Sequence, residues 1–195
     1  MNFDEQKQKY LDALYKPDKS KKGGVDKRVS TLIDEINKHP DYYTTSSCSG
    51  RISLFTCQDF TKKYTADWLV VSHEKISYEQ LEPFLHTTLP KQNVWFKQES
   101  FILHICARTL EKAKELLVFA QLNGYKHTGI IAMGKRFIIE LNGTQKIATP
   151  IVRKGELLVS HKHLLFLIEQ ANSQLGLVHA GIDTFLEMWK KKYSN

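Results

Sequence analysis

Short segments with the alternating pattern of β-strands recur along this 195-residue chain, and they limit the folds that it can adopt. In Arg51–Cys57, Ile52 and Leu54 fall on one face of the expected strand, with a polar residue between them. The segments Asn93–Gln98 and Phe101–Ala107 follow each other closely and are expected to form a strand pair. Further strands are expected at 42–45, 68–73, 128–133, 136–141 and 146–152.

Apolar residues at helical spacing mark the segments between the strands. The clearest is Val25–Ile36, whose apolar residues share one helical face and which Pro40 should end. A last long helix is expected to begin near Ser160, and Gly176 and Gly181 should weaken or break it. Other helices are expected at 3–14, 77–86 and 110–124.

The order of these segments determines the expected fold class. Strands with interspersed helices indicate an α+β fold, in which a mixed or antiparallel sheet packs against helices. A length of 195 residues fits a single domain over residues 1–195, or two closely packed halves. With 42% hydrophobic residues, the chain can bury a sizeable core.

The charge and cysteine content narrow the class of protein. The net charge of +7 favours an anionic partner such as nucleic acid, and part of this charge is clustered in Lys16–Arg28 and Lys190–Lys192. The three cysteines are odd in number and widely spaced, which fits a reducing compartment and not a disulfide framework. The polar start of the sequence is not a secretory signal, and no apolar run is long enough to span a bilayer. A cytoplasmic protein without a membrane segment is expected.

The most unusual segment is Thr44–Arg51, TTSSCSGR, between two expected strands. Most of its side chains carry a hydroxyl, a thiol or a guanidinium. Gly50 permits a tight turn with exposed backbone amides, and Arg51 could clamp a carboxylate or phosphate through two hydrogen bonds. The alternative interpretation is a polar hairpin turn with a structural Cys48.

Three sequence blocks together resemble the tRNA wybutosine-synthesising protein 3 family. They are KGGVD at 22–26, TTSSCSGR at 44–51 and WLVVSH at 68–73. Some members of that family carry Ala at the position of Ser49, so this hydroxyl is not expected to be essential. Later blocks agree at Phe101-x-Leu-His104-x-x-Ala-Arg108, Gly129-Ile130, 155–159 and Ala171-Asn172.

The resemblance implies a methyltransferase that uses S-adenosylmethionine. Its implied substrate is 4-demethylwyosine, or the aminocarboxypropyl form of that base, beside the anticodon of phenylalanine tRNA, with methylation at ring nitrogen N4. The implied fold is a family-specific α+β arrangement and not the doubly wound Rossmann fold. In agreement, no glycine-rich G-x-G follows a first strand.

Methyl transfer from a sulfonium to a ring nitrogen requires alignment and, at most, removal of a proton. The leaving thioether is neutral and the nitrogen has its own lone pair, so neither an acid nor a covalent Cys48 intermediate is needed. Asp26 is a candidate base or donor-binding carboxylate, although an acid there could simply stabilise a helix N-terminus. His73 is a candidate base, although a histidine at a strand end is usually structural.

Two sets of site residues follow from the resemblance. The catalytic set is Asp26, Ser47, Arg51 and His73. The set expected to bind the methyl donor is Ser46, Ser47, Cys48, Gly50 and Arg51.

Binding of the tRNA anticodon loop is assigned to basic residues. Lys22 is expected to pair with a phosphate, and Lys135 and Arg136 form the basic tip of an expected hairpin, although solvated charges would explain all three. Trp68 could stack on the flat base, but a tryptophan on an alternating strand is more often a core residue.

Other classes of protein explain only parts of the sequence. A non-catalytic RNA-binding protein explains the charge but not the dense polar segment. A cysteine phosphatase would need five residues between cysteine and arginine, whereas two separate Cys48 from Arg51. His161 and His163 invite a zinc site, but residues two apart on a helix point in different directions, so none is expected.

Overall fold

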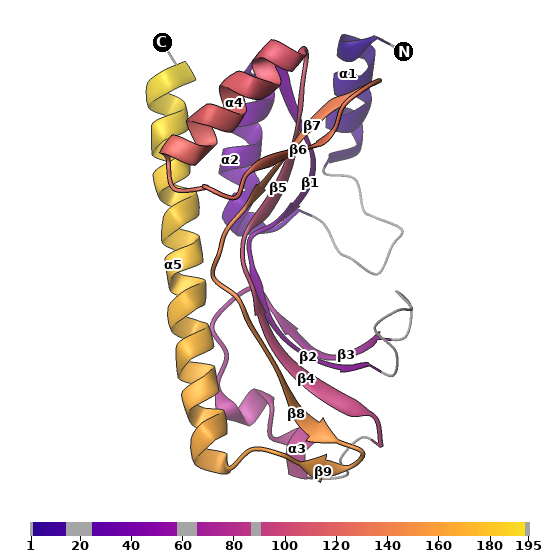
Figure 1. The fold of residues 1–195 in the computed structure, drawn as a ribbon, viewed down its shortest axis with the longest axis vertical. Helices are drawn as coiled ribbons and strands as arrows, with labels where there is room; N and C mark the ends of the chain where they lie inside the picture. The colour runs from indigo at the N-terminus through magenta and orange to yellow at the C-terminus, as the bar shows by residue number, and fades with distance from the viewer. Residues whose placement is uncertain (1, 15–24, 58–65, 87–90, 194–195) are drawn as a thin grey trace. The chain divides into compact units, whose positions relative to one another are not determined.

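The computed structural model describes residues 2–14, 25–57, 66–86 and 91–193. Within this part the chain forms two compact units, each built from separate stretches of sequence (Figure 1). Unit 1 comprises Met1–Ser49, Phe101–Thr144 and Val178–Asn195, and unit 2 comprises Gly50–Ser100 and Gln145–Leu177. The prediction of a single domain, or of two closely packed halves, stays a prediction.

Unit 1 contains a four-stranded sheet with the order β1-β5-β7-β6, in which every neighbouring pair is antiparallel. Helices α1, α2 and α4 accompany it (Figure 1). The strands are β1 (Tyr42–Cys48), β5 (Ile102–Ala107), β6 (Gly129–Ala132) and β7 (Phe137–Asn142), and the helices are α1 (Phe3–Leu14), α2 (Lys27–Lys38) and α4 (Leu110–Leu122).

Two consecutive tyrosines of β1 show how helices cover both faces of this sheet. Because successive side chains of a strand point to opposite faces, Tyr42 and Tyr43 meet different helices. Tyr42 is fully buried in the core with α2 and donates its hydroxyl proton to the Lys112 carbonyl of α4. Tyr43 packs on the opposite face against the rings of Phe3 and Tyr10 in α1.

Unit 2 contains a five-stranded antiparallel sheet with the order β3-β2-β4-β8-β9. Its core face, which includes Ile52, Leu54 and Phe96, packs against Leu164 and Ala171 of the last helix. The strands are β2 (Arg51–Cys57), β3 (Ala66–Ser72), β4 (Asn93–Glu99), β8 (Ile147–Arg153) and β9 (Glu156–Leu157), with a 3-10 turn at Tyr78–Gln80 and helix α3 (Pro83–His86).

Helix α5 (His161–Tyr193) runs without interruption through both glycines that were expected to break it, so this expectation is wrong. A glycine costs about 1 kcal/mol relative to alanine inside a helix. The apolar period continues past the glycines, and Phe185 and Trp189 are almost completely buried in the core of unit 1. Burial of a large side chain contributes about 1.5–3 kcal/mol, which outweighs the cost of the glycines.

The chain passes from one sheet to the other at points where the sequence suggested hairpins. Strands β1 and β2 do not pair with each other, so Ser49-Gly50 is a crossing between sheets and not a hairpin turn. Likewise β4 pairs with β2 and β8, whereas β5 pairs with β1 and β7. The expected strand pair of Asn93–Gln98 with Phe101–Ala107 is therefore wrong. The two residues between these segments, Glu99 and Ser100, are not the Asn or Gly that favour a two-residue hairpin turn.

The expected helix over residues 77–86 is also only partly present. It is replaced by the 3-10 turn and by the four residues of α3, which begins at Pro83. Proline has no amide proton to donate and is favoured at the first position of a helix, so it starts a new helix here instead of continuing one.

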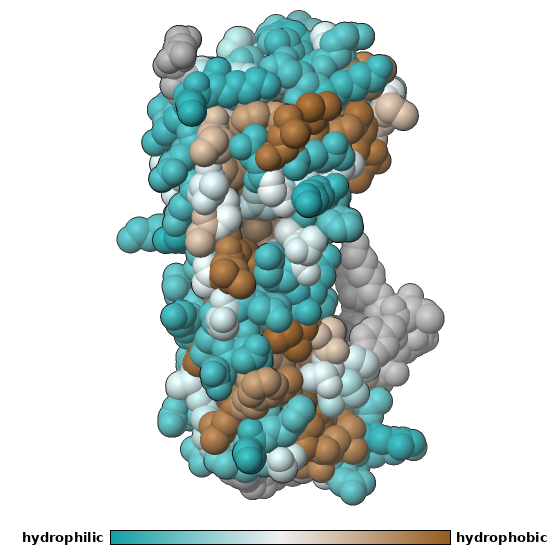
Figure 2. All heavy atoms as spheres, turned by 60° about the vertical axis from the view of Figure 1, so that its left-hand side comes forward, coloured by the Kyte–Doolittle hydropathy of each residue, from teal (hydrophilic) through white to brown (hydrophobic). Residues whose placement is uncertain are grey.

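The surface is mixed in character. No helix in the described ranges combines the length and the apolar composition that crossing a bilayer requires. Figure 2 shows a face on which hydrophobic side chains occur in separate areas divided by hydrophilic ones. The exposed large hydrophobic residues of α5 are Leu165, Phe166 and Leu177.

Candidate functional site at the junction of β1 and β2

The polar half of β1 begins with a bulge that α2 helps to hold. The pairing of β1 with β5 shifts between Thr44 and Ser46, which leaves Thr45 as the extra residue. Asn37 of α2 accepts a hydrogen bond from the Thr44 amide at 2.8 Å and donates one to the Thr44 hydroxyl at 3.1 Å. As a result Ser46 lies opposite His104, and its side chain is exposed, whereas Ser47 and Cys48 are half-buried.

Asp26 binds the residue that follows β1. Its Oδ2 accepts two hydrogen bonds from Ser49, one from the amide and one from the hydroxyl, each at 2.9 Å. Asp26 occupies the N-cap position of α2, yet its side chain makes no capping hydrogen bond to the helix. Its fixed contact is therefore with the strand junction, and a role confined to the start of the helix does not explain this geometry.

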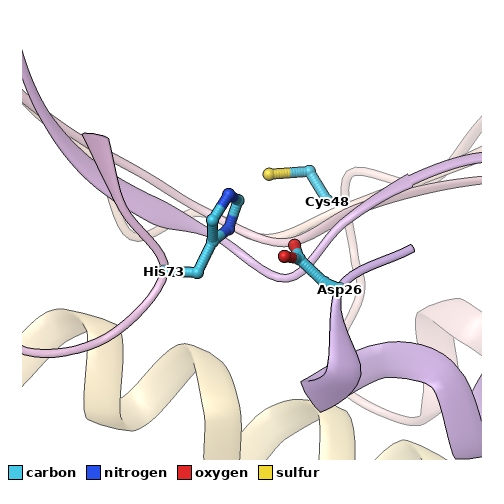
Figure 3. Close-up of side chains that lie close together, drawn as sticks. All are labelled: Asp26, Cys48 and His73. Atoms are coloured by element: carbon cyan, nitrogen blue, oxygen red, sulfur yellow. The ribbon is translucent and has the colours of Figure 1, made fainter. Parts of the chain in front are cut away.

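The Cys48 thiol lies beside this carboxylate. A carboxylate oxygen of Asp26 and the Sγ atom of Cys48 are within 4.8 Å of each other, and Figure 3 shows Asp26 at the start of α2 and Cys48 at the end of β1. Cys48 is a free thiol, as are Cys57 and Cys106. A role for Cys48 in packing or in donor binding stays a prediction.

Gly50 has a φ of 91°, a conformation that favours glycine over every other residue. Its carbonyl lies 3.0 Å from Nδ1 of His73, which follows β3. A carbonyl can only accept, so Nδ1 carries the proton, and the lone pair of a neutral His73 ring is on Nε2. Because Ser49 and Gly50 are consecutive, the hydrogen bonds of Asp26 and His73 end on adjacent residues of the chain.

The loop that carries His73 is held from α5 by Asn172. The Asn172 side chain accepts a hydrogen bond from the Ile76 amide at 2.9 Å and donates one to the Ile76 carbonyl at 2.8 Å. The Ile76 side chain is buried in the core of unit 2. Asn172 therefore substitutes for a strand partner and fixes the backbone three residues beyond His73.

Arg51 is part of an ion-pair network on unit 2. Its Nε donates to Oε2 of Glu99 at 2.5 Å, and Lys97 donates to Oε1 of the same carboxylate at 2.7 Å. Burial alone would raise the pKa of Glu99, but the hydrogen bonds from Arg51 and Lys97 outweigh it and hold this pKa below its ordinary value. Two cations share one anion, so the network keeps one excess positive charge.

Trp68 is not a core residue, so this interpretation of the sequence is wrong. The residue is 48% exposed. The Arg51 guanidinium carbon lies 4.8 Å from the centre of the Trp68 ring, and the Phe55 ring packs 5.3 Å from it, centre to centre. A register shift between Leu54 and Phe55 places Trp68 opposite Phe55, away from the core face that Leu54 occupies.

Comparison with known proteins identifies the family. A family model described as "Methyltransferase TYW3" matches residues 5–190. The chain belongs to this family. A relative from Thermococcus sibiricus, named tRNA(Phe) 7-((3-amino-3-carboxypropyl)-4-demethylwyosine(37)-N(4))-methyltransferase, is 38% identical over 89% of this chain and 87% of its own length. A relative from Danio rerio, named tRNA wybutosine-synthesizing protein 3 homolog, is 36% identical over 83% of this chain and 65% of its own length.

Solved structures agree with the TYW3 assignment. A Pyrococcus horikoshii protein, PH1069, is 33% identical with a TM-score of 0.81, covering 98% of this chain and 95% of that one. A protein from Aeropyrum pernix, titled a hypothetical protein, is 30% identical with a TM-score of 0.74, covering 87% of this chain and 100% of that one. The resemblance stated from the sequence is confirmed, as are the methyltransferase class and the non-Rossmann α+β fold.

Of the three residues expected to bind RNA, the structure describes two, one exposed and one bonded to a side chain of α1. Lys22 lies outside the described residues. Lys135 is exposed in the turn between β6 and β7. Arg136 donates to the Tyr10 hydroxyl at 2.7 Å, with its guanidinium 6.0 Å from the centre of that ring, so it anchors α1. An RNA contact by Lys135 or Arg136 stays a prediction.

One pair near the predicted donor-binding residues was missed from the sequence. The strand register places Ser46, His104 and Glu140 in one row across β1, β5 and β7. Nε2 of His104 lies 2.8 Å from Oε2 of Glu140, so the ring donates to the carboxylate and both side chains are half-buried. Alternation along β5 could have placed His104 on the face that points away from the core residues Leu103 and Ile105. Its partner Glu140 could not be predicted, because the pairing of β5 with β7 joins segments far apart in the sequence.

Proposed function

We propose that this TYW3 family member is a cytoplasmic tRNA methyltransferase. It methylates N4 of 4-demethylwyosine, or of its 7-aminocarboxypropyl derivative, at position 37 of phenylalanine tRNA, with S-adenosylmethionine as methyl donor. The names of the relatives support the substrate. The observation that carries the proposal for this chain is the Ser49-Gly50 junction, on which the hydrogen bonds of Asp26 and His73 end.

The residues of the junction suit the polar groups of the donor. The Ser46 hydroxyl is exposed and that of Ser47 is half-buried. Arg51 uses its Nε for Glu99, and its terminal amino groups make no hydrogen bond to any other described residue. A planar guanidinium of this kind can donate two parallel hydrogen bonds to a carboxylate, here the methionyl carboxylate of the donor. We assign Ser46, Ser47, Gly50 and Arg51 to the donor, with Cys48 packed beside them.

S-adenosylmethionine supplies a methyl group bound to a sulfonium sulfur. When the methyl group is transferred, this sulfur leaves as a neutral thioether. The chain's own residues therefore need only to align the base and to accept a proton from it. In its neutral form the His73 ring, with Nδ1 donating to the Gly50 carbonyl, carries its lone pair on Nε2, and we assign this atom as the acceptor of the N4 proton. The new bond joins N4 to the methyl carbon as the sulfur–carbon bond breaks. The mechanism needs no metal.

Asp26 is assigned a positioning and electrostatic role. Both hydrogen bonds from Ser49 enter through Oδ2 of Asp26, which holds the carboxylate in one orientation. A fixed negative charge beside the junction favours a cationic donor over a neutral one. The non-catalytic RNA-binding alternative does not account for membership in a methyltransferase family.

The reaction is tested by the mass of the modified base. In cells that lack this protein, tRNA should accumulate a wyosine precursor lighter by one methyl group, and purified protein with donor should convert that precursor. No conversion by the purified protein would reject the proposal.

The role of His73 is tested separately with two variants. His73→Ala should lower the single-turnover rate by about a hundredfold or more, the usual range for a lost general base. His73→Gln should be equally slow, although its amide can still donate to the Gly50 carbonyl. A His73→Gln variant with the wild-type rate would leave His73 with a structural role only.

A further inference from the structure

One face of the unit 2 sheet carries aromatic and basic side chains together. The strand register sets Phe55 opposite Trp68 on β3 and Trp95 on β4. Two residues further along β2 and β4, Ser53 lies opposite Lys97, and on β3 the register shift sets Val71 opposite Ser53. The last pair in this direction is Arg51 with Glu99. Because residues two apart share a face of a strand, these side chains lie on the face opposite to the core residues Ile52 and Leu54.

Part of this face is open to solvent. Trp68 is 48% exposed and Val71 is 45% exposed, and the Lys97 side chain is 37% exposed. Phe55, in contrast, is only 8% exposed and supports the indole from within the sheet. About half of the surface of Trp68 is therefore in water, and a tryptophan with both an apolar ring and an exposed part is a common feature of binding surfaces.

The charge beside the indole determines the kind of partner. Arg51 lies over the Trp68 ring, and Lys97 pairs with the same carboxylate as Arg51. With Glu99 included, this face keeps one net positive charge, and the whole chain carries +7. A flat aromatic surface with adjacent cations matches a nucleotide, whose base stacks and whose phosphate is anionic.

We propose that Trp68, Val71 and Lys97, here called the Trp68 surface, bind one unpaired nucleotide of the RNA substrate. The base stacks against the exposed part of the Trp68 indole, and Lys97 contacts a flanking phosphate. A duplex does not offer this contact, because its bases are already stacked on each other. The inference rests on the proposed function only in taking the anticodon loop of phenylalanine tRNA as the source of that nucleotide.

The test compares Trp68 variants in direct binding. The probe is the anticodon stem-loop of phenylalanine tRNA, and the reference is a blunt duplex of the same stem, which has no unpaired base. Trp68→Leu keeps an apolar side chain but loses the aromatic face, and should weaken stem-loop binding by at least about tenfold, or about 1.4 kcal/mol. Trp68→Phe should stay within about threefold of wild type, because a smaller aromatic face remains. Duplex binding should not change.

A matched control is available on α5. Phe166 is 53% exposed, so Phe166→Leu removes an aromatic ring of similar exposure from a helix of the same unit. This variant should bind the stem-loop as the wild type does. Circular dichroism should show equal folding for all variants, and calorimetric binding of S-adenosylmethionine should be unchanged in each of them.

Three results would overturn the inference. The first is Trp68→Leu binding the stem-loop as tightly as wild type, and the second is an equal loss for stem-loop and duplex. The third is a loss of donor binding with stem-loop binding intact, which would assign the surface to the adenine of the donor. The binding assay does not depend on methyl transfer. A chain that binds the stem-loop through Trp68 but methylates nothing would therefore reject the proposed function and leave this inference standing.

Discussion

The Asp26 carboxylate holds Ser49 by two hydrogen bonds that share a single oxygen, one from the amide and one from the hydroxyl. The two residues are 23 positions apart, and they join the start of α2 to the point where the chain leaves the first sheet. Ser49 is fully buried, so the polar atoms that bind Asp26 cannot readily turn to water.

Substitutions of Asp26 and Ser49 should separate the effect of the Asp26 negative charge from the effect of the hydrogen bonds between the two residues. Asp26→Asn keeps an acceptor oxygen and should fold, but loss of the negative charge should lower methyl transfer at least about tenfold, or about 1.4 kcal/mol. Asp26→Ala should also destabilise the fold by about 1–3 kcal/mol, because it leaves buried donors unpaired. Ser49→Ala keeps the amide contact and should stay within about threefold of wild-type activity. Urea unfolding and single-turnover rates measure both effects, and a fully active Asp26→Asn would exclude the electrostatic role.

Asn172 should be important for stability through the Ile76 backbone. Asn172→Ala removes one acceptor and one donor from a partly buried pair and should cost about 1–3 kcal/mol in urea unfolding. Hydrogen exchange of the Ile76 amide should become faster. Ser173→Ala changes the neighbouring exposed residue of the same helix and serves as the control. Equal stability of Asn172→Ala and wild type would contradict this account.

The elements of this fold were easier to predict than their pairing. Alternation of apolar and polar residues located β2, and helical spacing of apolar residues located α2, because both patterns are local in the sequence. The register is different, because it depends on contacts between strands far apart in sequence, such as Tyr42 of β1 opposite Ala107 of β5. The strand pair expected around Ser100 and the alternative of a hairpin turn at Ser49 were wrong for this reason.

The site shows the same limit. The polar run that ends at Arg51 stands out in the sequence, as does its resemblance to a family. The hydrogen bond of His104 to Glu140 spans 36 positions and has no local signal. The prediction that Trp68 is a core residue was wrong because alternation along a strand does not say which face packs against the core. Here the register shift beside Phe55 places Trp68 on the face away from the core.

The Arg51–Glu99 pair should make stability depend on pH. The pKa of Glu99 is held below its ordinary value of 4.5, so the ionised carboxylate stabilises the fold above that pH. This contribution should be lost as the pH falls through the lowered pKa. Glu99→Gln removes it, so the stability difference between wild type and variant should shrink from neutral pH to about pH 3. Thermal unfolding at several pH values gives the difference, and one independent of pH would contradict the prediction.

Binding of tRNA should weaken as salt rises, because lysine and arginine release counterions from phosphates. The affinity should fall at least about tenfold between roughly 50 and 200 mM salt. Lys135→Gln should lower the salt slope by about one unit if Lys135 contacts a phosphate. Lys162→Gln removes the same charge from the exposed start of α5 and is the comparison. A flat salt dependence in the wild type would count against an RNA substrate.

The role of Arg51 gives the sharpest test of where the site lies. Lysine can keep the ion pair with Glu99, but it loses the planar fork and the flat contact with Trp68. Arg51→Lys should therefore fold normally and cut single-turnover methylation of precursor tRNA by at least about tenfold, equivalent to roughly 1.4 kcal/mol of transition-state stabilisation.

Arg28 provides the matched control for this change. It is also a half-exposed arginine in an ion pair, with Asp183 as its partner, and exposed pairs of this kind contribute little. Arg28→Lys should thus leave the rate unchanged, and circular dichroism should confirm equal folding of both variants. If Arg51→Lys and Arg28→Lys react equally fast, the pair with Glu99 is a surface contact only. The donor would then have to bind elsewhere, and the row of Ser46, His104 and Glu140 on unit 1 is the next place to test.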